Sequence, residues 1–152
     1  MATFTHFTDN LLFCIVTGCK VYPGILVENI TNEKDLPPSF DAVNVLWDTG
    51  SEVTLINPRV VKQLNLKSFS YTELDGIGGS ETNKTYIIHI KLPTGDYAFN
   101  VEATETANTG EYDVVIGMDI ISFGDFALTN KNNKSMFSFR FPSECHIDFK
   151  CL

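Results

Sequence analysis

The stretch Val45-Leu46-Trp47-Asp48-Thr49-Gly50-Ser51 decides how the rest of this chain can fold. An apolar run carries the chain inward and stops at Asp48, although aspartate is depleted in strands and rarely buried without partners. Gly50 permits a sharp turn, while the hydroxyls of Thr49 and Ser51 can both donate and accept hydrogen bonds. These residues predict a carboxylate held by a tight polar loop at the floor of an apolar cleft. The simpler alternative is an ordinary hairpin turn, since Asp and Gly both favour turns.

The composition indicates a globular chain that does not bind nucleic acid. Its 152 residues are 43% hydrophobic and 20% charged, which is ordinary for one folded domain. The formal net charge of -8 argues against a nucleic-acid partner, because phosphate binding requires clustered Lys and Arg. The apolar run at 11–16 is too short for a secretion signal or a membrane span, and no basic segment precedes it. We therefore expect a soluble, cytoplasmic protein without a membrane partner.

Four cysteines allow several interpretations. Cys14, Cys19, Cys145 and Cys151 could form two disulfides in any of three pairings, or could bind zinc together with His146. Free thiols are favoured because no secretion signal is present. The spacings C-x4-C and C-H-x4-C match no common zinc finger, so we expect no metal and no cofactor. A zinc-stapled β domain without an enzymatic role is kept as an alternative, and it predicts loss of folding on chelation.

Short runs of alternating apolar and polar residues, separated by turns, predict a mainly β chain. We expect one or two short strands in 1–22 and further strands at 24–30, 40–47, 68–74, 85–92, 97–104, 112–116 and 126–129. Phe137, Phe139 and Phe141 alternate with polar residues and predict a last strand. Asn57-Pro58 predicts the start of a short helix, and 118–122 could form a helical turn. The pattern favours a closed, barrel-like β domain with one or two short helices.

Three motifs follow one another along the chain. They are Asp48-Thr49-Gly50 after an apolar strand, Gly76-Ile77-Gly78-Gly79 at a hairpin tip, and Val115-Ile116-Gly117. In these motifs and their order the chain resembles the retropepsin-like, or retroviral-type, aspartic proteases over roughly residues 40–130. The resemblance implies one retropepsin-like domain over 1–152, with a core at about 24–130, terminal extensions and an acid-protease-like barrel that forms a two-fold homodimer.

The resemblance also implies a role for each motif. Asp48 matches the catalytic aspartate, Thr49 would bond across the dimer axis, and the Gly50 amide would support the carboxylate. The tip at 76–79 matches the flap, a hairpin that closes over the substrate with Ile77 covering it. The segment 115–117 matches the strand end that crosses behind the active-site loop.

The chemistry explains why two copies are expected. Hydrolysis of a peptide bond without a metal needs one group that takes a proton from water and another that gives one to the carbonyl oxygen. Two carboxylates that share one proton do both, since two like charges about 3 Å apart cannot both ionise. The single Asp-Thr-Gly supplies half of this pair, so Asp48 of two copies is expected on a two-fold axis.

The expected function is that of an aspartic endopeptidase which cleaves extended, mostly apolar segments of a polypeptide. The alternative is a non-catalytic dimerisation or peptide-binding module on the same fold. Met118 stands where retroviral members carry an Arg that pairs near the loop, so the dimer must be held in another way. We expect the extensions to rebuild the dimer interface or to lengthen the sheet. A Ser51 hydroxyl that donates to the carboxylate would favour the charged form and shift the pH optimum toward acid.

Overall fold

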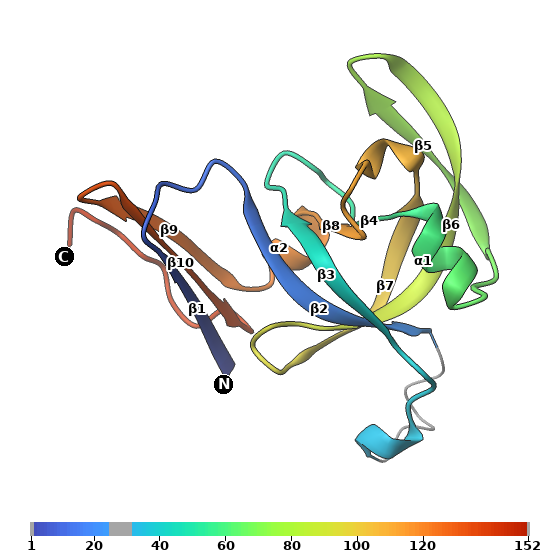
Figure 1. Ribbon diagram of the computed structural model, residues 1–152, viewed down its shortest axis with the longest axis horizontal. Helices are drawn as coiled ribbons and strands as arrows, with labels where there is room; N and C mark the ends of the chain where they lie inside the picture. The colour runs from blue at the N-terminus through green and yellow to red at the C-terminus, as the bar shows by residue number, and fades with distance from the viewer. Residues whose placement is uncertain (1, 25–31, 152) are drawn as a thin grey trace.

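The computed structural model describes residues 2–24 and 32–151, in which β-strands are the main regular structure (Figure 1). Within these residues the strands are β1 (Ala2–Thr8), β2 (Ile15–Pro23), β3 (Phe40–Trp47), β4 (Leu55–Ile56), β5 (Ser70–Gly76), β6 (Gly79–Lys91), β7 (Tyr97–Glu105), β8 (Val114–Ile116), β9 (Asp125–Lys131) and β10 (Lys134–Phe141). The helical elements are α1 (Pro58–Gln63), α2 (Met118–Ile121) and the 3-10 turns η2 (Glu33–Asp35) and η3 (Ala107–Thr109). The predicted mainly β class with two short helices is confirmed.

The larger sheet has the strand order β2-β3-β8-β4-β7-β6-β5. β2, the first strand in this order, pairs antiparallel with β3 and also with β6. The strand pairings therefore close into a ring. β3 and β8 run parallel, with Leu46 opposite Val115. β5 lies outside this ring and pairs with β6 from Ser70↔Thr85 to Gly76↔Gly79. The β5–β6 hairpin therefore projects from the rest of the sheet (Figure 1).

The two extensions pair with each other. β1 lies antiparallel to β10, with Ala2 opposite Phe141, and β10 in turn pairs with β9 in a separate three-stranded sheet. The expectation that the extensions lengthen the main sheet holds for β2, which lies before residue 24 and pairs with β3 and β6, and is wrong for β1 and β10. Apolar and polar residues alternate along β10, so one face of this strand is apolar. Phe137 and Phe139 on that face are 0% and 1% exposed and pack into the same core as the larger sheet, which lets β10 cover the core from a separate sheet.

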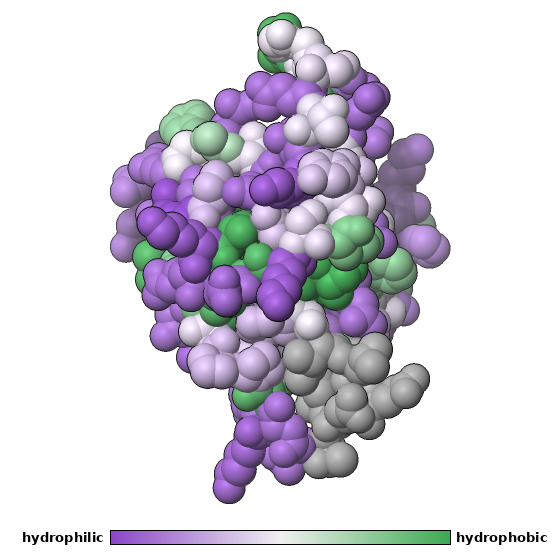
Figure 2. Space-filling view, turned by 90° about the vertical axis from the view of Figure 1, so that its right-hand side faces the viewer, coloured by the Kyte–Doolittle hydropathy of each residue, from purple (hydrophilic) through white to green (hydrophobic). Residues whose placement is uncertain are grey.

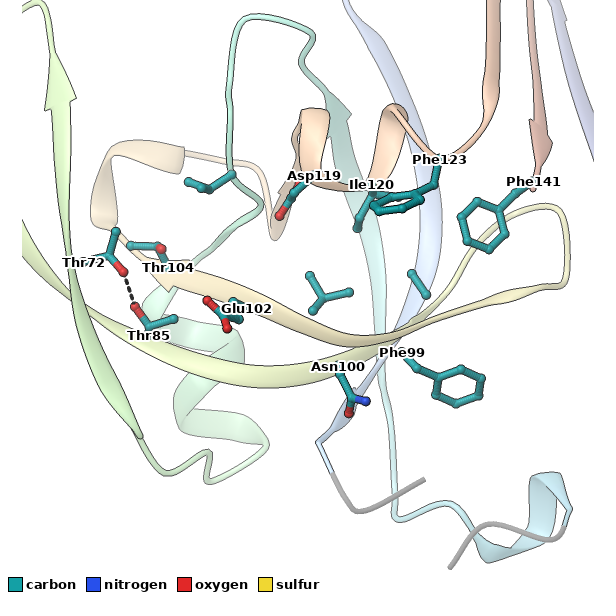
Figure 3. Close-up of a pocket in the computed structure, with 13 residues that line it drawn as sticks. Thr72, Thr85, Phe99, Asn100, Glu102, Thr104, Asp119, Ile120, Phe123 and Phe141 are labelled. Carbon is teal, nitrogen blue, oxygen red and sulfur yellow. Dashed lines mark hydrogen bonds between the residues drawn. The ribbon is translucent and has the colours of Figure 1, made fainter. Parts of the chain in front are cut away.

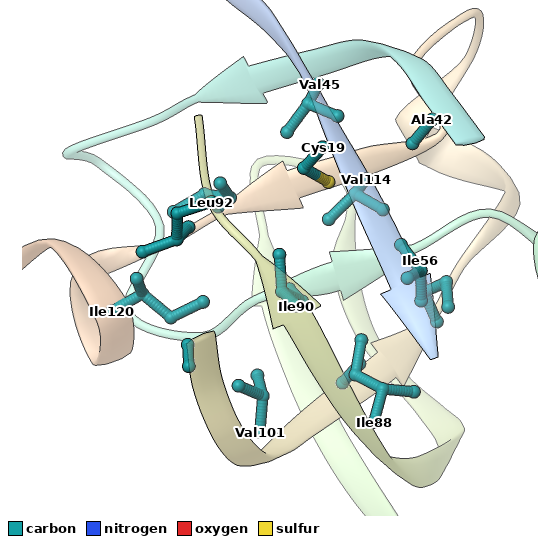
Figure 4. Packing of buried hydrophobic residues seen from close by; sticks show 14 of the residues in the cluster. Cys19, Ala42, Val45, Ile56, Ile88, Ile90, Leu92, Val101, Val114 and Ile120 are labelled. Atoms are coloured by element: carbon teal, nitrogen blue, oxygen red, sulfur yellow. The ribbon is translucent and has the colours of Figure 1, made fainter. Parts of the chain in front are cut away.

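The core lies where the strands of the larger sheet converge (Figure 4). Val45, Ile56, Ile88, Ile90 and Val114 are fully buried there, and β-branched side chains of this kind suit a packed strand surface.

Cys19 belongs to the same core cluster, and burial raises the pKa of its thiol to about 12. The four cysteines are unpaired in the structure. Cys19 thus serves as a small apolar side chain.

Most predicted elements lie within a few residues of the observed ones, and Asn57 caps α1 by accepting a hydrogen bond from the Arg59 amide at 3.0 Å. The strand predicted at 24–30 falls mainly outside the described residues, and β2 ends one residue before Gly24. Between 2 and 24, and between 32 and 151, no helix has the length and apolar character needed to cross a membrane.

Candidate active site

Asp48 follows directly on β3 and begins a tight loop. Its amide donates to the Ile116 carbonyl at 2.9 Å, so the start of the loop is fixed to the end of β8. The Gly50 amide donates to Asp48 Oδ1 at 2.8 Å, and the Ser51 amide donates to the Asp48 carbonyl at 3.2 Å. The half-buried carboxylate is thereby oriented by its own loop, as the sequence predicted for the Gly50 amide.

The 115–117 segment lies immediately behind this loop. The amide of Met118, the next residue, donates to the Ser51 carbonyl at 2.8 Å. A Cβ atom on Gly117 would lie 2.5 Å from the Val53 carbonyl oxygen, which is closer than real Cβ atoms come. Glycine is therefore required at this crossing because the two backbones approach so closely.

Thr54 and Asp119 form a second connection that the sequence did not reveal. The Thr54 amide donates to Asp119 Oδ2 and its hydroxyl donates to Asp119 Oδ1, each at 2.8 Å. The Gly117 amide donates to the same hydroxyl oxygen at 3.4 Å, and Thr54 is fully buried. The two residues are 65 positions apart, so no local spacing could have linked them. Their contact joins the active-site loop to α2.

Trp47 connects the residue before Asp48 to the three-stranded sheet. Its ring centroid lies 4.7 Å from that of Phe139 and 5.3 Å from that of Phe137. The indole Nε1 donates to Thr17 Oγ1 at 2.9 Å, so the polar end of the ring is satisfied although only 4% of the residue is exposed. The extensions therefore support the active-site strand from behind.

The Ser51 hydroxyl does not donate to the Asp48 carboxylate. Its oxygen Oγ donates to the Val53 carbonyl at 2.7 Å, and a hydroxyl has only one proton to give. The sequence-based argument for an acid-shifted pH optimum therefore loses its basis, because the short loop returns to Val53 and offers a nearer acceptor.

A cavity of about 740 Å³ separates the Asp48 loop from the β5–β6 hairpin. Its lining includes Asp48, Gly50 and Ser51 on one side and the tip residues Gly76, Ile77, Gly78 and Gly79 on the other. Ile77 is fully exposed, and Figure 2 shows an apolar group at the very tip, above a mainly hydrophilic face. Thr49 is also exposed. The structure thus brings two of the three sequence motifs to one cavity, with the third directly behind it.

The cavity carries an acidic lining that the sequence motifs did not predict. Five of its lining residues are acidic, namely Asp48, Glu52, Glu73, Asp75 and Glu81. Among the described residues that line it there is no Lys, Arg or His. The observed ion pairs involve none of these five carboxylates. Within the same described ranges, no three His, Cys, Asp or Glu side chains are grouped so that they could hold a metal ion.

One comparison with known protein families covers the part of the chain that carries the motifs. A family model described as aspartyl protease matches residues 41–120, which is more than half of the chain and includes all three motifs. Among solved structures, the chain is similar to a retropepsin-like aspartic protease from Rickettsia conorii at 9% sequence identity, with a TM-score of 0.48 and coverage of 91% of this chain and 94% of that chain. No curated protein sequence matches it. By the family match, the chain belongs to the aspartyl proteases.

Proposed function

We propose that this protein is an aspartic endopeptidase that acts as a homodimer, in which Asp48 of two copies forms the catalytic pair. The observation that carries the proposal is the position of Asp48, half-buried in a cavity between its own loop and the glycine-rich hairpin. Family membership supports the peptidase activity. The ring of strand pairings in the larger sheet supports the closed barrel, and residues 1–152 act as one domain in this proposal.

In the proposed reaction the two carboxylates share one proton. The ionised carboxylate takes a proton from water as the water oxygen attacks the peptide carbonyl, and the protonated one gives its proton to the carbonyl oxygen. The first carboxylate then gives its newly acquired proton to the amide nitrogen while the second takes a proton from a hydroxyl of the gem-diol, and the C–N bond breaks to release the acid and the amine. The Gly50 amide holds the Asp48 oxygen in place, and Thr49 is exposed where it can bond to the second copy. The hairpin closes over the peptide and excludes water.

Exposed apolar side chains near Asp48 support the homodimer. Leu11 is 41% exposed and Phe13 is 94% exposed, in the segment that precedes β2. The first residue of β2, Ile15, pairs with Trp47, so this segment ends beside the active-site loop. Figure 1 shows the loop before β2 and the loop after β3 at the same edge of the molecule. A second copy meeting at that edge would cover both side chains and bring its own Asp48 to the site.

The substrate in this proposal is an extended polypeptide. Val53, Leu55, Leu74 and Ile77 line the cavity and suit apolar residues next to the scissile bond. The acidic residues beside them favour basic residues further along the peptide.

The test is cleavage of a peptide library over a range of pH by the wild-type protein and the Asp48→Asn variant. Asp48→Asn should abolish cleavage, because the amide can neither take nor give the required proton. Asp41→Asn is the matched control, since Asp41 lies on β3, the strand that leads to Asp48, and its exposed carboxylate pairs with Lys20. That control should keep full activity. Cleavage by purified Asp48→Asn at the wild-type rate would overturn the proposal.

Mixing the two proteins tests the shared pair. Random exchange of equal amounts leaves about half of the wild-type subunits in wild-type dimers, so activity per wild-type subunit should fall to about half. Sedimentation should show a dimer under the same conditions. An active monomer, or no loss on mixing exchanged subunits, would contradict the dyad. A dimer that cleaves no peptide at any pH would instead favour the non-catalytic module.

A further inference from the structure

A second cavity, of about 610 Å³, lies between β7, α2 and the end of β10. Figure 3 shows that its two ends differ. Three threonines, Thr72, Thr85 and Thr104, lie at one end, and three aromatic side chains, Phe99, Phe123 and Phe141, lie at the other. Ile120, Ala98 and Val101 add further apolar lining. The cavity is therefore lined by threonines at one end, where the Thr72 and Thr85 hydroxyls bond to each other at 2.8 Å, and by apolar side chains at the other.

The aromatic end is held by contacts outside the cavity. Phe141 stacks on Phe139 with their centroids 6.4 Å apart, and Phe99 stacks on Tyr97 at 5.4 Å. The carbonyl of Phe123 accepts a hydrogen bond from the Ser143 amide at 2.7 Å, which fixes the backbone after α2. Even so, Phe123 is 66% exposed and Phe99 is 42% exposed. These rings are positioned from behind while much of their surface remains accessible.

The two cavities are neighbours. Val53 and Thr72 line both of them, and Thr72 belongs to the threonine end of the second cavity. β5 is the last strand in its sheet, so one of its edges has no partner among the described strands. An extended peptide can add to such an edge by backbone hydrogen bonds. Thr72 lies four positions before Gly76, which is about 13 Å along a strand, or about four residues of an extended peptide.

We propose that this second cavity binds a large apolar or aromatic side chain of the substrate, about four residues from the scissile bond. The inference rests on the proposed peptidase function. The peptide leaves the active-site cavity along β5, passes the threonine end, and places this side chain against Phe123 and Phe141. In a two-fold dimer each subunit supplies one such pocket, so the preference occurs on both sides of the cleaved bond.

The first test compares peptides that share one cleavable centre. The peptides are compared in pairs that differ at one position only, which is one of positions three to six on either side of the scissile bond. One peptide of each pair carries Phe at that position and the other carries Ala. Phe at one of these positions should raise kcat/KM about tenfold over Ala, the range expected when an apolar pocket is filled. In the Phe123→Ala variant this ratio should fall toward one. Phe149→Ala is the matched control, because Phe149 is 70% exposed and lies outside the cavity, and it should keep the ratio.

The second test reports binding without cleavage. A peptide with p-benzoylphenylalanine at the responsive position, or at position four if none responds, is photolysed with the Asp48→Asn protein and the adducts are mapped by mass spectrometry. Adducts on Phe99, Phe123 or Phe141 support the pocket, even if the wild-type protein cleaves nothing and the proposed function fails. This inference is overturned if the peptides are cleaved without any preference for Phe at positions three to six and the adducts form only on other residues or not at all. The peptidase proposal would then remain intact.

Discussion

At the scale of single residues, the local part of the site could be predicted and the distant part could not. Asp48 and Gly50 are two positions apart, so the turn chemistry of Asp-Thr-Gly is enough to expect the bond between them. The bond between Thr54 and Asp119 depends on how β8 and α2 return behind the loop, which no nearby residue indicates. Ser51 was misjudged for a related reason. A hydroxyl has several acceptors within reach, and only the backbone path decided between Asp48 and Val53.

Replacing Thr54 tests the connection to Asp119. Thr54→Val keeps the shape but removes the hydroxyl, leaving Asp119 Oδ1 and the Gly117 amide without this partner. We expect a loss of about 1–3 kcal/mol in the free energy of unfolding, measured with urea, and a lower kcat. Thr54→Ser keeps the hydroxyl and should retain most of the activity. Equal activity of the Val and Ser variants would rule out a positioning role.

Replacing Ser51 tests the correction to its role. Ser51→Ala removes the hydrogen bond to the Val53 carbonyl, so the free energy of unfolding should fall by about 0.5–1.5 kcal/mol. The pH dependence of kcat/KM should keep its position, because the hydroxyl does not contact the Asp48 carboxylate. A movement of the acidic limb by a full pH unit would mean that the hydroxyl donates to the carboxylate during catalysis.

At the scale of elements, strand positions could be predicted more easily than strand partners. The alternating phenylalanines identified β10 from the sequence, since a period of two is a property of one strand. Its pairing with β1 joins residues more than 130 positions apart, such as Phe4 and Phe139, and no turn specifies that register. The β5–β6 hairpin was predicted together with its glycine tip because the turn residues lie next to each other. Only the structure shows how far both strands extend.

Asp125, at the start of β9, anchors the segment that follows β10. Hydrogen bonds from the Ser143 hydroxyl at 2.5 Å and the Glu144 amide at 2.9 Å, with the Arg140 guanidinium, hold the pKa of this carboxyl well below its usual range. The unfolded chain, with a carboxyl pKa of about 3.9, therefore takes up the proton first as pH falls. This contribution to stability is present above about pH 4 and is lost as pH falls toward the lower folded-state value.

The Asp125→Asn variant should therefore be less stable than the wild type at neutral pH and should lose less stability below pH 4. Thermal unfolding followed by circular dichroism from pH 7 to pH 2 measures this difference. Asp9→Asn is the control, because Asp9 is exposed and pairs only with Lys134. A variant curve parallel to that of the wild type would show that Asp125 is not responsible for the acid dependence.

At the scale of the whole molecule, the net charge of -8 had a simple interpretation from composition, namely solubility. The structure shows that part of this charge gathers in one place, because loop and hairpin bring Glu52, Glu73 and Glu81 around Asp48. Composition gives the total charge but not its distribution, since the distribution depends on which loops meet. The fold class, the family and the motifs could thus be predicted from the sequence, whereas the character of the cavity could not.

Peptides with Lys or Arg flanking an apolar scissile pair should have a lower KM than peptides with Glu there. Raising the salt concentration from 50 mM to 500 mM should increase the KM of the basic peptides about threefold, since exposed charges are screened over a shorter distance. Glu73→Gln should reduce this salt dependence of KM. Glu111 lies outside the cavity, so Glu111→Gln should leave the salt dependence unchanged. Identical salt dependence for basic and acidic peptides would exclude electrostatic selection.

Trp47 is the single tryptophan of the chain; it is the last residue of β3, next to Asp48, and its ring packs against the phenylalanines of the three-stranded sheet. Its intrinsic fluorescence is therefore a native optical probe of the joint between the two sheets. A red shift of the emission would mean that water has entered behind the strand that leads to Asp48, and no attached dye is needed to detect it.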